Sequence, residues 1–207
     1  MKVMVVSPHP DDETLGAGGT LLRLKKEGHQ IYWLNITDAK EKDGWSASFI
    51  KQRKEQIQRV CDFFEFDDTF NLKFPPAKLE MLEKSILIQK IGSCFQTVEP
   101  EWIILPDPND AHSDHKITYE SCISCSKIFR YPYIHRITTM EILSETDFGR
   151  IDNPFVPNYF VNISDYMKSK IQALEIYDTE LGEHPFPRSV DLSLIHISEP
   201  TRPRLIS

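Results

Sequence analysis

The fold is decided close to the N-terminus, by the stretch Val3-Met4-Val5-Val6-Ser7-Pro8-His9-Pro10-Asp11-Asp12-Glu13. Its first four residues form an unbroken apolar run, which is typical of a strand buried on both faces of a parallel sheet. The run ends at Ser7-Pro8, and an imidazole and three carboxylates follow within five residues. A buried strand that leads into such a loop predicts an α/β fold with a ligand site at the end of the first strand.

Strands and helices are predicted to alternate along the rest of the chain. Apolar runs predict strands at 3–6, 30–37, 69–74, 102–105, 137–143 and 159–163. A period of 3.6 residues predicts helices at 20–27, 46–64, 79–95, 114–129 and 164–181. This alternation indicates βαβ units, and therefore a Rossmann-like three-layer α/β/α fold with a mainly parallel sheet.

The composition excludes several partner classes. The chain has 207 residues and a formal net charge of -7, so it lacks the basic surface that nucleic acid requires as a main partner. It has no run of about 18 apolar residues, so we expect no stable membrane insertion. Its four cysteines, without an export signal, indicate reduced thiols and a cytoplasmic location. The sequence is compatible with a homo-oligomer but does not specify one.

Two further motifs have competing interpretations. Cys122 and Cys125 have the spacing of a metal or redox pair, but they lie in a predicted helix without a second pair, so we interpret them as buried thiols. The stretch Gly16-Ala17-Gly18-Gly19 raises the alternative of a non-catalytic nucleotide-binding module. It does not fit the G-x-G-x-x-G pattern, and the acids before it would repel phosphate, so this alternative is disfavoured.

A second polar loop follows the predicted strand at 102–105 and contains His112-Ser113-Asp114-His115. The carboxyl ends of parallel strands lie at one edge of a sheet, so this loop and the first one should meet there. His9 and Asp12 are three residues apart and could bind one metal ion, with His115 as a third ligand. Three nitrogen or oxygen ligands and an open position are the set that catalytic zinc prefers.

The remaining polar residues have assignable roles in such a site. Asp11 would stay free as the general base that a zinc-bound water needs. His112, once protonated, would face the oxygen of the tetrahedral intermediate, and Asp114 would orient His112 and raise its pKa. The alternative is that the three acids of the first loop only favour a helix dipole, which is our interpretation of Glu13.

The two motifs together resemble the PIG-L/LmbE-like N-deacetylase family. The resemblance covers roughly residues 1–185 and rests on Pro8 to Glu13, on Gly16 to Thr20 and on His112-x-Asp114-His115. It implies zinc, or another divalent transition metal, held by His9, Asp12 and His115, with Asp11 as the base and His112 assisting charge stabilisation. The implied reaction removes the acetyl group from an N-acetylglucosamine-type sugar conjugate.

The resemblance also implies a substrate-binding arginine, to which Arg53 corresponds. The alternative for Arg53 is a solvated helix face. Trp45 is a candidate for stacking on a sugar ring, or else a core anchor at the helix start. The runner-up function is a zinc amidohydrolase acting on a non-sugar N-acyl substrate, which would use the same metal, base and oxyanion groups.

The end of the sequence departs from this pattern. Residues 192–207 have no periodicity and resemble a translated cloning scar, whereas the family usually continues with a further helix. We therefore predict a C-terminally truncated deacetylase domain at 1–191 and a non-native tail at 192–207. We expect the tail to make few contacts with the core.

Overall fold

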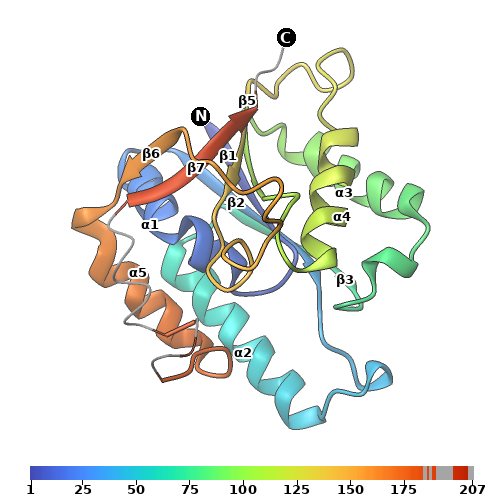
Figure 1. Ribbon diagram of the computed structural model, residues 1–207, viewed down its shortest axis with the longest axis vertical. Helices are drawn as coiled ribbons and strands as arrows, with labels where there is room; N and C mark the ends of the chain where they lie inside the picture. The colour runs from blue at the N-terminus through green and yellow to red at the C-terminus, as the bar shows by residue number, and fades with distance from the viewer. Residues whose placement is uncertain (184–185, 187, 190–197, 205–207) are drawn as a thin grey trace.

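The computed structural model describes residues 1–183, 186, 188–189 and 198–204. Its centre is one sheet in which the first five strands run parallel (Figure 1). In spatial order the strands are β3 (Asp68–Phe74), β2 (Gln30–Thr37), β1 (Lys2–Ser7), β4 (Trp102–Pro106), β5 (Arg136–Met140), β7 (Ser198–Arg204) and β6 (Tyr159–Asn162). The predicted, mainly parallel sheet is confirmed.

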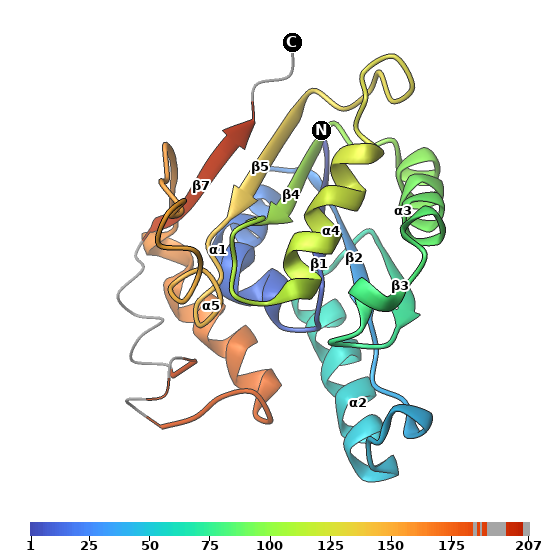
Figure 2. The same cartoon turned by 45° about the vertical axis from the view of Figure 1, so that its right-hand side comes forward.

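Helices cover both faces of the sheet, so the predicted three-layer arrangement is confirmed (Figure 2). One face carries α1 (Asp12–Lys26), α2 (Ala47–Phe64) and α5 (Met167–Leu174), and the other carries α3 (Lys84–Val98) and α4 (Ser113–Ser124). Each face has its own apolar cluster, and the alternate residues of β1 divide between them: Val3 and Val5 point to one, Met4 and Val6 to the other. That division explains why the first strand is an unbroken apolar run.

Helix α1 begins at Asp12, eight residues before the predicted start at residue 20. Glycines disfavour helix and conceal its beginning in the sequence. Here they permit close packing: a Cβ atom on Gly16 would lie 2.7 Å from Sδ of Met140, and one on Gly19 would lie 2.6 Å from Cδ1 of Ile163. Gly16 and Gly19 therefore serve helix packing, which argues further against a phosphate-binding loop.

Other helix boundaries also differ from the predictions. The helix predicted at 79–95 is a 3-10 turn, Leu79–Met81, followed by α3. The one predicted at 114–129 ends at Ser124, and the one predicted at 164–181 is α5 flanked by two 3-10 turns, Ser164–Tyr166 and Glu175–Tyr177. Helix α2 is capped by Ser46, whose hydroxyl accepts a hydrogen bond from the amide of Phe49.

The structure also bears on the cysteine pair and on membrane-spanning helices. Cys122 and Cys125 are fully buried and unoxidised, which confirms the interpretation as buried thiols. Among the described residues, no helix is both long and apolar enough to cross a membrane. The cytoplasmic location stays a prediction.

The C-terminal segment does not lie wholly outside the fold. Ser198–Arg204 forms β7, which pairs antiparallel with both β5 and β6. The buried carboxylate of Glu199 accepts hydrogen bonds from the amides of Gly19 and Thr20 and from Nζ of Lys170. The expectation of few core contacts is therefore wrong for these seven residues. The rest of the tail lies outside the described residues, and its non-native origin stays a prediction.

The order of the strands in the sheet determines where the candidate site lies. From β1 the chain proceeds through β2 to β3 on one side and then crosses to β4 and β5 on the other. The carboxyl ends of β1 and β4 therefore flank the point where the sheet changes direction, which is where open α/β sheets bind ligands. Both predicted loops begin there.

Candidate metal and active site

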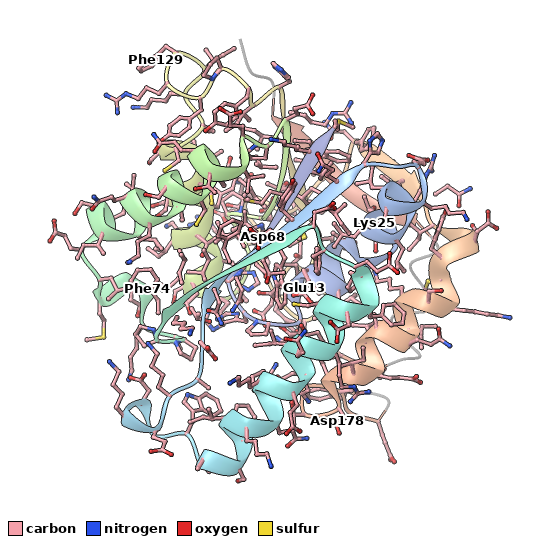
Figure 3. All side chains as sticks on the ribbon, turned by 180° about the vertical axis from the view of Figure 1, so that it is seen from behind. Glu13, Lys25, Asp68, Phe74, Phe129 and Asp178 are labelled. Carbon is pink, nitrogen blue, oxygen red and sulfur yellow. The ribbon has the colours of Figure 1, made fainter. Side chains whose placement is uncertain are left out.

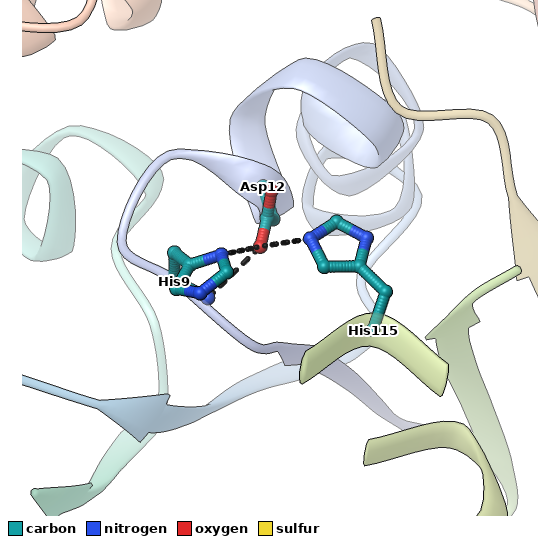
Figure 4. Close-up of side chains that lie close together, drawn as sticks. All are labelled: His9, Asp12 and His115. Carbon is teal, nitrogen blue, oxygen red and sulfur yellow. Dashed lines mark hydrogen bonds and ion pairs between the residues drawn. The ribbon is translucent and has the colours of Figure 1, made fainter. Parts of the chain in front are cut away.

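His9, Asp12 and His115 converge at this point, as Figure 4 shows. Oδ2 of Asp12 lies 3.4 Å from Nδ1 of His9 and 3.4 Å from Nε2 of His115. One ligand atom from each residue lies within 4.8 Å of the others, close enough for all three to bind one ion. The prediction that the two loops meet at one centre therefore agrees with the geometry.

Local backbone structure directs these side chains. Asp12 opens α1, and the preceding Asp11 has a φ of 129°, a conformation uncommon for a residue other than glycine. Such strain is often found at functional sites, where the surrounding structure enforces it. His115 lies in the first turn of α4, and His112 caps that helix. Both loops thus end in helix starts, which fix the directions of the site side chains.

The buried polar atoms fit a metal ion. Nε2 of His115 and Oδ1 of Asp12 are buried and have no hydrogen-bond partner within the described part of the chain. Leaving such atoms unpaired is costly, and coordination would satisfy them. The remote nitrogens are held by carboxylates: Nδ1 of His115 lies 2.8 Å from Asp110, and Nε2 of His9 lies 3.0 Å from Asp114. Metal-binding histidines are usually oriented in this way.

Asp114 thus contacts a different histidine from the one expected. Its carboxylate accepts hydrogen bonds from His9 and from the backbone amides of Ala77 and Leu79. His112 is held instead by the backbone amide of Asp114, which donates to Nδ1 of His112 over 3.1 Å. Burial and the nearby charge of His9 lower the pKa of His112. The charge of Asp114 raises the pKa of His112, as expected, but burial and the charge of His9 outweigh it, so the net shift is downward.

Charge in the site is concentrated on the candidate ligands. Burial alone would lower the pKa of His9, but hydrogen bonds to Asp114 and Asp12 raise it to about 9. Burial opposes protonation of His115 in the same way, and Asp12 and Asp110 raise its pKa to about 10. Burial would raise the pKa of Asp12, but His115 and His9 hold it well below its usual range. Asp12 is thus an anionic centre between two imidazoles, each of which must release its proton to bind a metal ion.

Asp11 stands beside this cluster without joining it. Burial and the negative charge of Asp12 raise the pKa of Asp11 to about 8, against the effect of Arg188. Glu13 lies in the first turn of α1, as expected of a helix-start acid, but it is buried. It accepts hydrogen bonds from the amide of Asp11 and the hydroxyl of Tyr177. Glu13 therefore supports the loop in addition to lying at the helix start.

Arg188 is a site residue that the sequence analysis missed. Its guanidinium donates to Asp11 over 2.8 Å, to Glu145 over 2.9 Å and to the Ser144 hydroxyl over 2.6 Å. It thus joins the first loop, the segment after β5 and the segment after α5. The sequence signal was weak, because Arg188 follows prolines in a segment without periodicity.

Arg53 and Trp45 both line the pocket in front of Asp11. Arg53 is only 7% exposed and donates to the carbonyl of Pro10 over 3.0 Å and to Glu180, so the alternative of a solvated helix face is wrong. Trp45 is 41% exposed and stacks on Phe49, so it is not a core anchor. Neither finding tests substrate contact, which stays a prediction for both residues.

The pocket has a volume of about 300 Å³ and connects the candidate metal centre to the surface. Its lining combines polar groups at the sheet edge with an aromatic wall, which consists of Trp45 and Phe49 at the start of α2. It is lined by His9, Pro10, Asp11, Thr37, Asp38, Ala39, Trp45, Phe49, Arg53, Pro76, Ala77, His112, Glu180 and Arg188.

Fold and site together define an α/β protein with a His-Asp-His cluster that could hold a metal ion at its topological switch point. The family described as PIG-L: GlcNAc-PI de-N-acetylase matches residues 4–126, which is more than half of the chain. The chain belongs to this family, as its motifs suggested. The match contains both loops of the site.

Two relatives to which the chain is similar bear the names of deacetylases. The chain is 24% identical over 208 residues to the diacetylchitobiose deacetylase of Thermococcus kodakarensis, covering 92% of this chain and 76% of the relative. It is 26% identical over 183 residues to the probable N-acetyl-alpha-D-glucosaminyl L-malate deacetylase 2 of Bacillus cereus, covering 83% of this chain and 80% of the relative. The N,N'-diacetylchitobiose deacetylase structure from Pyrococcus horikoshii shares the fold with a TM-score of 0.75 at 20% identity, covering 98% of this chain and 83% of that one.

Proposed function

We propose that this protein is a zinc-dependent hydrolase that removes the N-acetyl group from an N-acetylglucosamine-type sugar conjugate. One observation carries the proposal: His9, Asp12 and His115 converge beside a separate carboxylate, Asp11, and both His9 and Asp11 line an open pocket. Family membership and the two deacetylase relatives, whose named substrates are N-acetylated glucosamine sugars, support the same reaction.

The metal would be held by Nδ1 of His9, a carboxylate oxygen of Asp12 and Nε2 of His115. Zinc in such a set supplies Lewis acidity, which polarises an amide carbonyl and lowers the pKa of water. The same ligands suit other divalent transition metals, so metal analysis of the protein would identify the ion. Asp114 and Asp110 act as positioning residues, because each holds the remote nitrogen of one histidine ligand.

Asp11 is the proposed general base. It lines the pocket, lies next to a ligand in sequence and has one carboxylate oxygen without a hydrogen-bond partner among the described residues. That oxygen would take the proton of the attacking water and later return it to the leaving nitrogen. Water and the amide are thereby converted to acetate and a free amine.

His112 would stabilise the charge that develops on the acetyl oxygen. Its Nδ1 accepts a hydrogen bond from the backbone, so a neutral ring carries its proton on Nε2. The lowered pKa of His112 favours this neutral form, which still donates a hydrogen bond to the oxygen. We therefore propose a neutral donor instead of the protonated imidazole that the sequence suggested.

The test is to load the protein with zinc and measure acetate release from N-acetylglucosamine conjugates and from N-acetyl amino acids. Arg53 and Trp45, the proposed substrate contacts, line a pocket whose aromatic wall suits the apolar face of a sugar ring. We expect turnover of the sugar conjugates and little turnover of the amino acids. The reverse preference would favour the non-sugar amidohydrolase, and absence of acetate with every substrate would refute the proposal.

A further inference from the structure

The pocket continues outward from the metal centre along α2. Arg53 is almost fully buried and donates to the carbonyl of Pro10, next to the candidate ligands. Phe49 lies one helical turn, about 6 Å, before Arg53 along α2. The centre of its ring lies 5.3 Å from Cζ of the Arg53 guanidinium. Trp45 lies four residues before Phe49. The order Arg53, Phe49, Trp45 therefore runs from the floor of the pocket to its mouth.

Exposure increases along the same direction. Arg53 is buried, Phe49 is half-buried and Trp45 is exposed. The rings of Trp45 and Phe49 stack with centroids 4.6 Å apart and planes 20° apart, so Phe49 covers one face of Trp45 and the stacked pair forms the aromatic wall of the pocket. Pro76 and Ala77, after β3, also line the pocket. In Figure 2 the start of α2 projects beyond the carboxyl ends of the strands. Trp45 and Phe49, which line the pocket, lie at this end of the helix.

The charges of the pocket disfavour an anionic group in this outer part. Three acids line the pocket, namely Asp11, Asp38 and Glu180. The two arginines that line it are both paired with carboxylates: Arg53 with Glu180, and Arg188 with Asp11. Along the part of the lining that the structure describes, no arginine or lysine remains free for a carboxylate of the substrate.

We propose that Trp45 and Phe49 form a subsite for a neutral ring attached to the N-acetylated sugar, and that this subsite selects uncharged glycans over dicarboxylate conjugates. The inference rests on the proposed deacetylase function. The acetamide would face Asp11 at the inner end, the sugar that bears it would lie near Arg53, and the second ring would stack on the aromatic wall. A flat, half-apolar sugar face suits such a wall, whereas a dicarboxylate would find no free cation in a pocket whose lining also contains Asp38.

Kinetics with three substrates test this subsite. The zinc-loaded protein is given N-acetylglucosamine, neutral N,N'-diacetylchitobiose and the malate conjugate of N-acetylglucosamine. We expect the highest kcat/KM for the disaccharide. Trp45→Ala should lower that kcat/KM about ten-fold, through KM, the size expected for one lost aromatic contact, and should lower the value for the monosaccharide much less. Trp45→Phe should restore most of the loss.

A matched control is Phe129→Ala. Phe129 is 75% exposed, and Figure 3 shows it at the opposite end of the molecule from α2. This substitution should change none of the three kcat/KM values. A preference for the malate conjugate, or an equal loss in Trp45→Ala for the monosaccharide and the disaccharide, would overturn the subsite.

Tryptophan fluorescence gives a binding readout that does not depend on turnover. Of the three tryptophans, Trp33 and Trp102 are each 2% exposed, so acrylamide quenching reports on Trp45. In Asp11→Asn, diacetylchitobiose should protect this fluorescence, and N-acetylglucosamine should not. Equal quenching with and without the disaccharide would overturn the subsite. If the wild type releases no acetate from any substrate, the proposed function fails, and the quenching still decides whether the aromatic wall binds a neutral glycan.

Discussion

Arg188 donates a hydrogen bond from Nη1 to Oδ2 of Asp11 over 2.8 Å, although 177 positions separate the two residues in the sequence. The other oxygen of Asp11, Oδ1, is buried and without a partner in the described parts of the chain. A cation therefore fixes one oxygen of the carboxylate, and the second remains available to accept a proton. This asymmetry fits the proposed role of Asp11 as a base and motivates the first two predictions.

Asp11→Asn should retain zinc and lose activity. Asp11 lies outside the three proposed ligands, whereas Asp12 contacts both histidines. We expect turnover to fall by roughly 10²-fold or more, the usual contribution of a general base. Zinc content by atomic emission should match the wild type in Asp11→Asn and drop in Asp12→Asn. Equal loss of zinc in both variants would show that the two roles are exchanged.

Arg188→Ala should reduce kcat while leaving zinc bound. The guanidinium holds Asp11 and Glu145, and removing a charged hydrogen bond of this kind should cost on the order of 10-fold in kcat. The control is Arg150→Ala, because Arg150 forms an exposed ion pair with Asp152. In an Asp11→Asn background the substitution should cause little further loss, since both changes act on one carboxylate. If Arg188→Ala lowers kcat by the same factor in Asp11→Asn as in the wild type, Arg188 acts on the substrate itself.

Zinc should stabilise the fold through His115. A ligand at 100 times its Kd stabilises the native state by about 2.7 kcal/mol, which raises Tm by several degrees. We expect this zinc-dependent shift in the wild type, its removal by a chelator and its loss in His115→Ala. His135→Ala is the control, because His135 is exposed before β5. If both variants keep the full shift, zinc binds elsewhere.

Asp114→Asn distinguishes the two metal sets that the geometry allows. His9, His112 and Asp114 also bring ligand atoms within 4.8 Å of one another. If Asp114 only orients His9, the variant should bind zinc about 10–100-fold more weakly but keep one site. Isothermal titration would measure both affinity and stoichiometry. A complete loss of binding in Asp114→Asn, with binding kept in Asp12→Asn, would assign the metal to the second set.

Deletion of residues 192–207 should lower the melting temperature. The segment contains β7, which lies between β5 and β6, and Glu199, which is the carboxylate partner of the buried Lys170. Loss of that partner leaves an uncompensated buried charge, so Glu199→Gln alone should also destabilise the protein. Thermal unfolding followed by circular dichroism would measure both effects. An unchanged Tm in both variants would mean that the segment does not belong to the fold in solution.

The sequence by itself determined the architecture and the centre of the site. The apolar run before His9 and the one before His112 each specify a buried strand, and strand ends in an alternating α/β chain meet at one edge. Placing His9, Asp12 and His115 together therefore needed only local pattern and topology. Helix starts were less predictable: the glycines of α1 disfavour helix locally and are kept there by contact with Met140 and Ile163.

The tertiary structure alone decided which side chains pair across the site. The carboxylate of Asp114 contacts His9, whereas His112, its neighbour in sequence, contacts only the backbone amide of Asp114. Arg188 reaches Asp11 from a segment without periodicity, and Arg53 is buried although its helix is amphipathic and largely exposed. Such pairings depend on distances between segments far apart in the chain. Local sequence patterns specify how each segment folds, but the direction of a side chain into a shared pocket is fixed only when the layers pack.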